Sequence, residues 1–172
     1  MSIIRKLNGK TPKIGENCFI AETAVIIGDV EIGDDCSIWY GAVLRGDVNP
    51  IRIGKRVSVQ DNVVLHTTYQ KSVVTLEDDV AVGHNATVHG ATVRAGALIG
   101  IGATVLDFAE VGEGAIVAAN ALVLANTQIE AGSIYAGVPA KFVKKMDVEQ
   151  SKAVNQLISK GYQLYKSWYE EE

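Results

Sequence analysis

Residues 93–129 read VRAGALIGIGATVLDFAEVGEGAIVAANALVLANTQI and carry an aliphatic residue at every sixth position. The same spacing covers most of the 172-residue chain, with short interruptions after Leu44 and Leu65 and a one-residue deletion before Val93. The positions in phase are Ile14, Ile20, Ile26, Ile32, Ile38, Leu44, Ile53, Val59, Leu65, Leu76, Val82, Val88, Val93, Ile99, Val105, Val111, Val117, Val123 and Ile129. A period of six fits neither an α-helix nor simple strand alternation. It predicts short strands joined by tight corners, three of which close one triangular coil.

Small residues usually lie four positions after the aliphatic one, at Ala24, Cys36, Ala86, Ala97, Ala103, Ala115 and Ala121. One large and one small inward residue per strand suit the narrow interior of such a coil. Hydrophobic residues make up 48% of the chain but aromatic residues only 6%, which also indicates an aliphatic core. The sequence therefore predicts an all-β solenoid of hexapeptide repeats.

The C-terminal segment has a different pattern. Asp147 and Gln150 have the spacing of a capping box, and apolar residues then recur at helical spacing at Val154, Leu157, Ile158, Tyr162, Tyr165 and Trp168. We expect one domain over residues 1–172, with a β-helix over about 11–140 and an α-helix over about 147–170. The apolar stripe of that helix is expected to pack on the coils or on a neighbouring subunit.

Composition excludes several classes of function. The formal charge is −4 with acidic and basic residues interspersed, so there is no basic stripe for a nucleic acid. No apolar run reaches membrane-spanning length, and residues 1–10 contain no apolar segment typical of a signal peptide. Cys18 and Cys36 lie one coil apart at small inward positions, and we interpret them as buried thiols. We expect a soluble cytoplasmic protein.

The repeat predicts where the three histidines point. His66 follows Leu65 and His89 follows Val88, three faces later, so both should project outward from one face, one coil apart. His84 belongs to the preceding face and should point elsewhere. A neighbouring subunit could supply its own His84, and rotational closure would then give a homotrimer with three metal sites at its interfaces.

Three imidazoles without a thiolate suit Zn²⁺, with Fe²⁺ or Co²⁺ as alternatives. A structural zinc site is normally closed by a fourth protein ligand, whereas three ligands leave a position open for water. Zinc in such a site lowers the pKa of water to about 7 and so provides hydroxide at neutral pH. The sequence thus predicts a catalytic metal site at His66, His84 and His89.

The same arithmetic places polar groups near this site. Arg45 should lie directly under His66, with Asp47 close by, and Asp61 should lie beneath His84. An Arg45–Asp61 pair between subunits would satisfy both charges, as a catalytic pair or as an ordinary trimer salt bridge. Gln60 precedes Asp61, and its neutral amide could orient a hydroxide through hydrogen bonds.

Together these residues resemble the γ-class carbonic anhydrases and their bacterial relatives. The motifs that carry the resemblance are Arg45-Gly46-Asp47, Val59-Gln60-Asp61, and the three histidines with Gly83 and Gly90. The hexapeptide repeat also resembles that of left-handed β-helix proteins, and both resemblances imply a left-handed parallel β-helix. The resemblance to the carbonic anhydrases implies reversible hydration of CO₂ to bicarbonate by a metal-bound hydroxide. It implies His66, His84 and His89 as ligands, Gln60 as the residue that orients hydroxide, Arg45 and Asp61 as an interface pair, and Asp47 and Tyr162 as further active-site residues.

The chain departs from the family pattern at three places. The segment Thr67–Lys71 contains no carboxylate where well-known members have a proton-shuttling glutamate. Val48 and Ser58 stand where the pattern has a glutamate and an asparagine. Loss of a proton relay should slow turnover even with an intact metal site.

Two alternatives to carbonic anhydrase activity stay open. One is acyl-CoA chemistry, by transfer or by thioester hydrolysis, because residues 136–141 (AGVPAK) resemble the segment that closes the coils of hexapeptide acyltransferases. A transferase would more typically use a histidine as general base and leave it free of metal. The other is a metal-binding homologue with weak or no catalysis.

Overall fold

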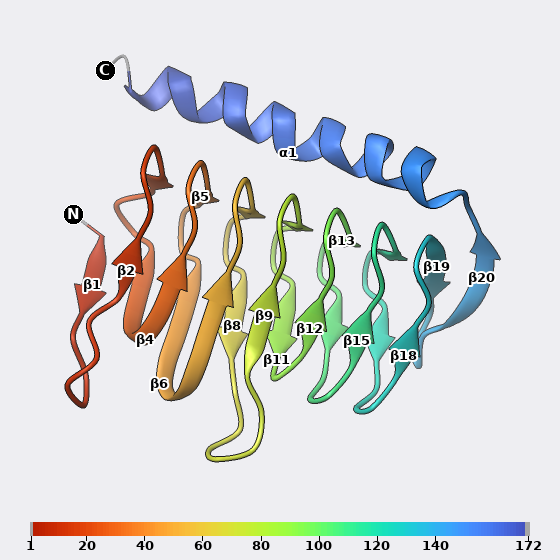
Figure 1. The fold of residues 1–172 in the computed structure, drawn as a ribbon, viewed down its shortest axis with the longest axis horizontal. Coiled ribbons are helices and arrows are strands. Elements are labelled where there is room, and N and C mark those ends of the chain that lie inside the picture. The colour runs from red at the N-terminus through yellow and green to blue at the C-terminus, as the bar shows by residue number, and fades with distance from the viewer. Residues whose placement is uncertain (1, 171–172) are drawn as a thin grey trace.

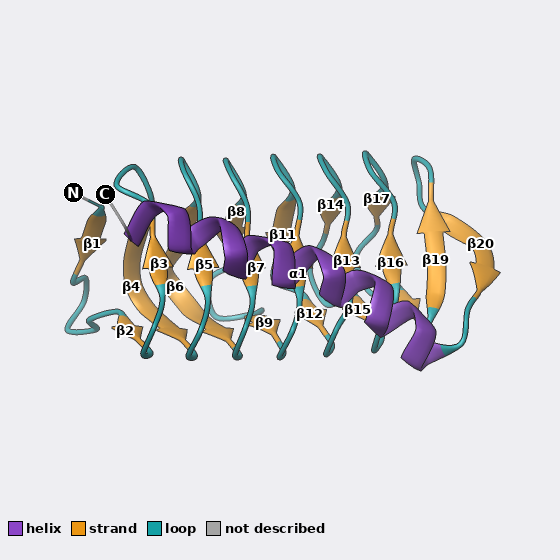
Figure 2. Cartoon of the chain, turned by 90° about the horizontal axis from the view of Figure 1, so that it is seen from above, coloured by secondary structure: helices purple, strands orange, loops and turns teal. Residues whose placement is uncertain are grey.

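The computed structural model describes residues 2–170, without the side chains of residues 159, 163 and 170. It is a parallel β-solenoid of about seven turns with one C-terminal helix. In Figure 1 the chain rises on the near side and descends on the far side as the coils advance from left to right. Figure 2 shows it crossing the top from front to back. This rotation is left-handed, as predicted.

The coils present three faces, each a ladder of parallel strands. The histidine face consists of β8 (Val64–His66), β11 (Thr87–His89), β14 (Thr104–Val105) and β17 (Leu122–Val123). The charged face consists of β9 (Val74–Leu76), β12 (Thr92–Val93), β15 (Glu110–Val111) and β18 (Gln128–Ile129). The helix-covered face consists of β3 (Phe19–Ile20), β5 (Ser37–Ile38), β7 (Ser58–Val59), β10 (Ala81–Val82), β13 (Leu98–Ile99), β16 (Ile116–Val117) and β19 (Ser133–Ala136).

Two long strands, β4 (Val25–Ile32) and β6 (Val43–Ile53), bend around the corner between the histidine face and the charged face. One end of β6 pairs with β8 and the other end pairs with β9. The first strands, β1 (Ile3–Arg5) and β2 (Lys13–Ile14), both pair with β4. At the other end β20 (Lys141–Lys145) pairs antiparallel with β19, a closing hairpin that the repeat does not predict.

The core follows the six-residue repeat. Every in-phase position from Ile26 to Ile129 is buried, and Ile14 and Ile20 are partly buried against the same core. The small positions from Ala24 to Ala121 are buried as well. Each fully buried aliphatic side chain stabilises the fold by about 1.5–3 kcal/mol, so these stacked aliphatic columns dominate its stability.

The C-terminal helix α1 (Val148–Glu170) begins where the sequence predicts. Asp147 Oδ1 accepts a hydrogen bond from the backbone N–H of Gln150 at 3.1 Å, as an N-cap does. The helix runs back along the helix-covered face (Figure 2), so that its last turn lies beside the first coils (Figure 1). No helix among residues 2–170 is both long and apolar enough to cross a membrane.

Only part of the predicted apolar stripe of α1 packs on the coils of its own chain. Ser151 and Asn155 are fully buried against the coils, whereas Val154, Leu157 and Trp168 are at least half exposed. The reason is the close approach of the helix to two corners of the coils. The Ser151 hydroxyl donates to Gly114 O at 2.6 Å and the Asn155 amide donates to Gly96 O at 2.9 Å, contacts that small polar side chains make best.

Candidate metal centre

His66 and His89 lie side by side at the ends of β8 and β11, where they are register partners. His66 Nδ1 and His89 Nε2 face each other at 3.2 Å. Two nitrogens that each lie about 2.0–2.1 Å from a tetrahedral zinc ion are separated by about 3.3–3.4 Å. The pair therefore has the spacing of two ligands of one metal ion.

The opposite ring nitrogens of both histidines contact carboxylates. His66 Nε2 lies 3.0 Å from Asp47 Oδ1, and His89 Nδ1 lies 2.8 Å from Asp107 Oδ2. A carboxylate accepts the N–H of an imidazole, which leaves the other nitrogen with a lone pair. Two lone pairs would then face each other across 3.2 Å, an arrangement that a cation between them would stabilise. The donor set fits a divalent metal such as Zn²⁺.

Arg45 stabilises the first of these carboxylates. Its Nη1 donates to Asp47 Oδ2 at 2.5 Å. Burial works to raise the pKa of Asp47, but the hydrogen bonds from Arg45 and His66 outweigh it and lower that pKa. Asp47 is thus a carboxylate at neutral pH.

His84 lies at the other edge of the histidine face, on the corner between β10 and β11. Its Nδ1 contacts Asp61 Oδ2 at 2.8 Å, and its Nε2 lies 3.0 Å from the hydroxyl of Tyr162 on α1. Burial and the negative charge of Asp61 raise the pKa of Tyr162, so its hydroxyl can donate to His84 Nε2. Within residues 2–170 of one chain, no three side chains of the metal-ligating types converge.

Gln60 connects His84 to a pocket under α1. Its Oε1 accepts the backbone N–H of His84 at 3.1 Å, and no described residue takes a hydrogen bond from its Nε2. The pocket has a volume of about 400 Å³, with Gln60, His84 and Tyr162 among its polar groups. Most of its wall is aliphatic: Leu98, Ile99, Ile101, Ile116, Val117 and Ile158.

The structure thus brings the predicted residues into two half-sites at opposite edges of one face. The first half-site contains Arg45, Asp47, His66 and His89, and the second contains Gln60, Asp61, His84 and Tyr162. Within one chain Arg45 pairs with Asp47 and Asp61 pairs with His84. The Arg45–Asp61 pair between subunits stays a prediction.

Asp107 and Ser72 are contacts of this site that sequence reasoning missed. The backbone register pairs Val88 with Val105, so His89 is level with Leu106, and Asp107 lies one residue beyond. A search restricted to residues at the same position of successive coils therefore does not find Asp107. An acidic residue at a corner one coil above a histidine is the sequence feature that could have indicated it.

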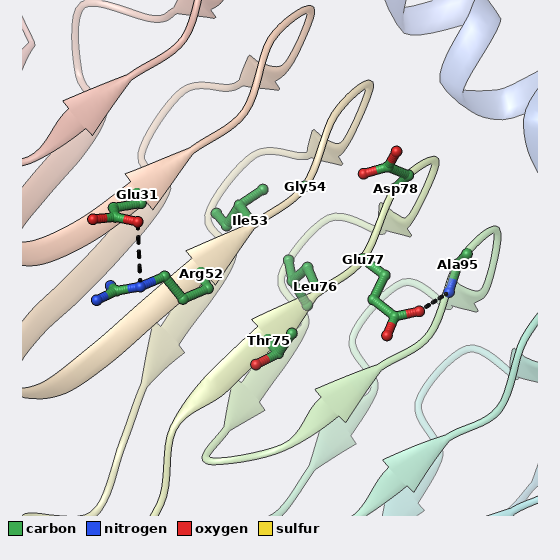
Figure 3. Close-up of a pocket in the computed structure, with 9 residues that line it drawn as sticks. All are labelled: Glu31, Arg52, Ile53, Gly54, Thr75, Leu76, Glu77, Asp78 and Ala95. Carbon is green, nitrogen blue, oxygen red and sulfur yellow. Dashed lines mark hydrogen bonds and ion pairs between the residues drawn. The ribbon is translucent and has the colours of Figure 1, made fainter.

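Two other features lie away from the histidines. The thiols of Cys18 and Cys36 are free and lie in the first coils. A hollow of about 580 Å³ on the charged face is lined by charged residues such as Glu31, Arg52 and Glu77 (Figure 3). Arg52 contacts Glu31 there, and Glu77 accepts the backbone N–H of Ala95, so these polar groups already have partners.

Comparison with known proteins decides the family. The family profile described as bacterial transferase hexapeptide (six repeats) matches residues 11–46. "Gamma carbonic anhydrase 2, mitochondrial" of Arabidopsis thaliana is 45% identical over 152 residues, covering 86% of this chain and 55% of that protein. A carbonic anhydrase of Geobacillus kaustophilus is 44% identical over 169 residues, covering 96% of this chain and 92% of that protein. The chain belongs to the γ-class carbonic anhydrase family.

A solved structure agrees with this assignment on the fold. The hexapeptide transferase family protein of Anaplasma phagocytophilum is 36% identical, with a TM-score of 0.91 over 97% of this chain and 98% of that chain. The γ-class carbonic anhydrase family and proteins described as hexapeptide transferases thus share this scaffold. The site, rather than the scaffold, has to decide the chemistry.

Proposed function

We propose that this member of the γ-class carbonic anhydrase family catalyses the reversible hydration of CO₂ to bicarbonate, as a metal-dependent lyase. The observation that carries the proposal is the 3.2 Å approach of His66 Nδ1 and His89 Nε2, each with a carboxylate on its opposite nitrogen. Zn²⁺ held there, or Fe²⁺ or Co²⁺ in its place, would lower the pKa of water to about 7 and so supply the nucleophile at neutral pH.

The third ligand in this proposal is His84 of a neighbouring subunit. The two half-sites occupy opposite edges of the histidine face, and a cyclic trimer joins one edge of each subunit to the other edge of the next. Val64 and Leu124 on this face are 37% and 47% exposed, an apolar surface that such an interface would bury. The exposed Tyr165 of α1 lies near it, because its ring meets the ring of Tyr162 edge to face and Tyr162 contacts His84.

In the proposed trimer each polar residue has a separate task. The Nε2 of Gln60, which no described residue uses, is placed to donate to the nucleophilic oxygen and orient it toward CO₂. Asp47 and Asp61 hold the imidazoles of His66 and His84 in one orientation. The Tyr162 hydroxyl, now bonded to His84 Nε2, would turn toward the reacting oxygen when that nitrogen binds metal.

We expect removal of the proton to be the slow step of the reaction in this protein. The loop from Thr67 to Lys71 contains no carboxylate, so buffer has to accept the proton that hydration releases. Turnover should therefore depend on buffer concentration. A cytoplasmic location is part of the same proposal.

The test is CO₂ hydration by the protein loaded with Zn²⁺ and then, anaerobically, with Fe²⁺, from pH 6 to 9 at several buffer concentrations. Activity that rises through an apparent pKa near 7, and with buffer, supports the proposal. No hydration at full metal occupancy overturns it and leaves a metal-binding homologue without this activity.

The pocket under α1 favours a second candidate, metal-assisted hydrolysis of a small acyl thioester. Pockets that hold small organic ligands measure about 300–1,000 Å³, and the cavity beside Gln60 and His84 is about 400 Å³ and mostly aliphatic. CO₂ has only three heavy atoms and does not need that space. Substituting Ala118→Leu narrows the pocket, so it should reduce thioester hydrolysis and leave CO₂ hydration unchanged. Failure of the metal-loaded protein to cleave any short-chain acyl thioester rules out this candidate.

A further inference from the structure

We propose that Asp107, held by Ser72, is a positioning residue that fixes His89 with its Nε2 toward the metal. The inference rests on the proposed metal site and adds a residue pair that lies outside every motif described above. It also gives the loop between β8 and β9, which projects from the coils in Figure 1, a task other than proton transfer.

The contacts form a continuous chain behind His89. Asp107 Oδ2 lies 2.8 Å from His89 Nδ1, and Ser72 Oγ donates to Asp107 Oδ1 at 2.5 Å. Ser72 Oγ itself accepts the backbone N–H of Thr68 at 3.0 Å, which leaves its own hydrogen for the carboxylate. Ser72 is 2% exposed, so water does not compete for these bonds.

The loop that carries Ser72 is itself tied down. The Asn49 side-chain amide donates to Thr68 O at 2.9 Å and to Ser72 O at 2.7 Å. Asn49 comes from β6, the long strand that also carries Arg45 and Asp47. The loop is thus anchored at both of the backbone carbonyls that flank the Ser72 hydrogen bond.

The contact between Ser72 and Asp107 requires a residue without a side chain at Gly90. A Cβ atom at this position would collide with Ser72 Oγ and Asp107 Oδ1, and the backbone φ of Gly90 is 59°. Both constraints favour glycine. The glycine after His89 is therefore explained by the Ser72–Asp107 pair that lies against it.

A carboxylate is the group that this geometry needs. Both of its oxygens face donors, His89 Nδ1–H on one side and the Ser72 hydroxyl on the other. Asparagine has one oxygen, so its amide N–H₂ would face one of the two. The buried Ser72 hydroxyl already accepts the Thr68 N–H and still has its own hydrogen to donate, so the asparagine oxygen should face Ser72 and the amide N–H₂ should face His89. Nδ1 of His89 must then accept, the hydrogen moves to Nε2, and that nitrogen can no longer bind a metal.

The experiment compares wild-type protein with Asp107→Asn and Ser72→Ala. The control is Asp79→Asn, which removes the same charge from an Arg56 ion pair at a corner away from the histidines. Zn²⁺ affinity is measured by competition with a chromogenic chelator, and the His89 tautomer by ¹⁵N NMR of the metal-free protein at pH 9. Thermal unfolding of the metal-free variants checks folding.

We expect Asp107→Asn to weaken Zn²⁺ binding by about 10–100-fold and to place the His89 hydrogen on Nε2. Ser72→Ala should weaken binding by about 3-fold with the tautomer retained, and it serves if Asp107→Asn does not fold. Unchanged affinity and an unchanged tautomer in Asp107→Asn would overturn the inference. If wild-type protein binds no Zn²⁺, the proposed function fails, while the tautomer measurement still decides the role of Asp107.

Discussion

The charged face and the histidine face are built from the same repeat but treat their polar groups differently. On the charged face Arg94 lies between Glu110 and Glu77, at 2.8 and 2.7 Å, and Arg52 contacts Asp29 at 2.8 Å. The hydrogen bonds that Arg94 donates to Glu110 and Glu77 raise the pKa of Arg94, so the pairs stay ionised. This face satisfies its charges along its own ladder.

The histidine face brings two like groups together instead of pairing opposite charges. His66 Nδ1 and His89 Nε2 face each other across 3.2 Å, and exposed Val64 and Leu124 lie on the same face. The same strand spacing can therefore carry a surface whose charges are paired within the face, or a surface suited to bind another group. The outward side chains alone decide which of the two forms. Facing ring nitrogens beside exposed aliphatic side chains are what we expect of a face that a metal ion and a second subunit complete, as proposed above.

The largest effect is expected from removing the ligand on the far edge of the histidine face. His84→Ala should reduce metal content from about one ion per chain to background, because every interface loses one of its three ligands. The coils should remain folded, since the His84 side chain contributes nothing to the aliphatic core. Metal content after dialysis and circular dichroism measure both. A full metal complement in this variant would show that His84 is not a ligand.

Introducing a glutamate on each face in turn tests whether the histidine face alone forms a subunit interface. Val64→Glu puts a carboxylate in the proposed interface, where burial without a partner costs several kcal/mol, so we expect monomers and loss of most of the bound metal. Thr75→Glu puts the same charge on the charged face and should change neither property. Light scattering coupled to gel filtration gives the mass. If the two variants have the same mass and the same metal content, the proposed difference between the two faces is wrong.

Gln60→Glu tests catalysis without removing a ligand. The new side chain keeps an oxygen for the His84 backbone N–H but loses the amide donor, so kcat/KM for CO₂ hydration should fall by about 10–100-fold at unchanged metal content. Gln128→Glu on the charged face makes the same chemical change and should have no effect. An unchanged kcat/KM in Gln60→Glu would show that Gln60 has no role in the reaction.

The smallest effect is expected on the charged side. Burial works to raise the pKa of Asp29, but the Arg52 hydrogen bond and the charges of Arg52 and Lys10 lower it overall. A lowered folded-state pKa stabilises the protein above the ordinary aspartate range and loses that effect as the pH falls. Asp29→Asn should thus cost up to about 1 kcal/mol of unfolding free energy at pH 7 and nothing near about pH 2. Urea unfolding at both pH values checks this, and a deficit that persists at low pH would point to packing instead.

The sequence predicts the coils well because one repeat sets both phase and burial. It places His66 beside His89 and directs His84 elsewhere, since both follow from counting faces. It does not predict that Ser151 and Asn155 of α1 pack on the coils, because they bond to corner carbonyls that no apolar pattern reveals. It also misses Asp107, which meets His89 only through a one-residue offset between coils.

Helix α1 changes how the stack of coils should come apart. In a solenoid each coil contacts only its neighbours, so the ends can fray independently of the middle. Here the helix starts at the last coil and returns along the whole stack, and Lys166 Nζ donates to Asn17 O at 2.6 Å near the first. Opening either end therefore strips contacts from the other. The helix is therefore expected to couple the opening of the two ends, so that the coils unfold as one cooperative unit instead of through separate local equilibria.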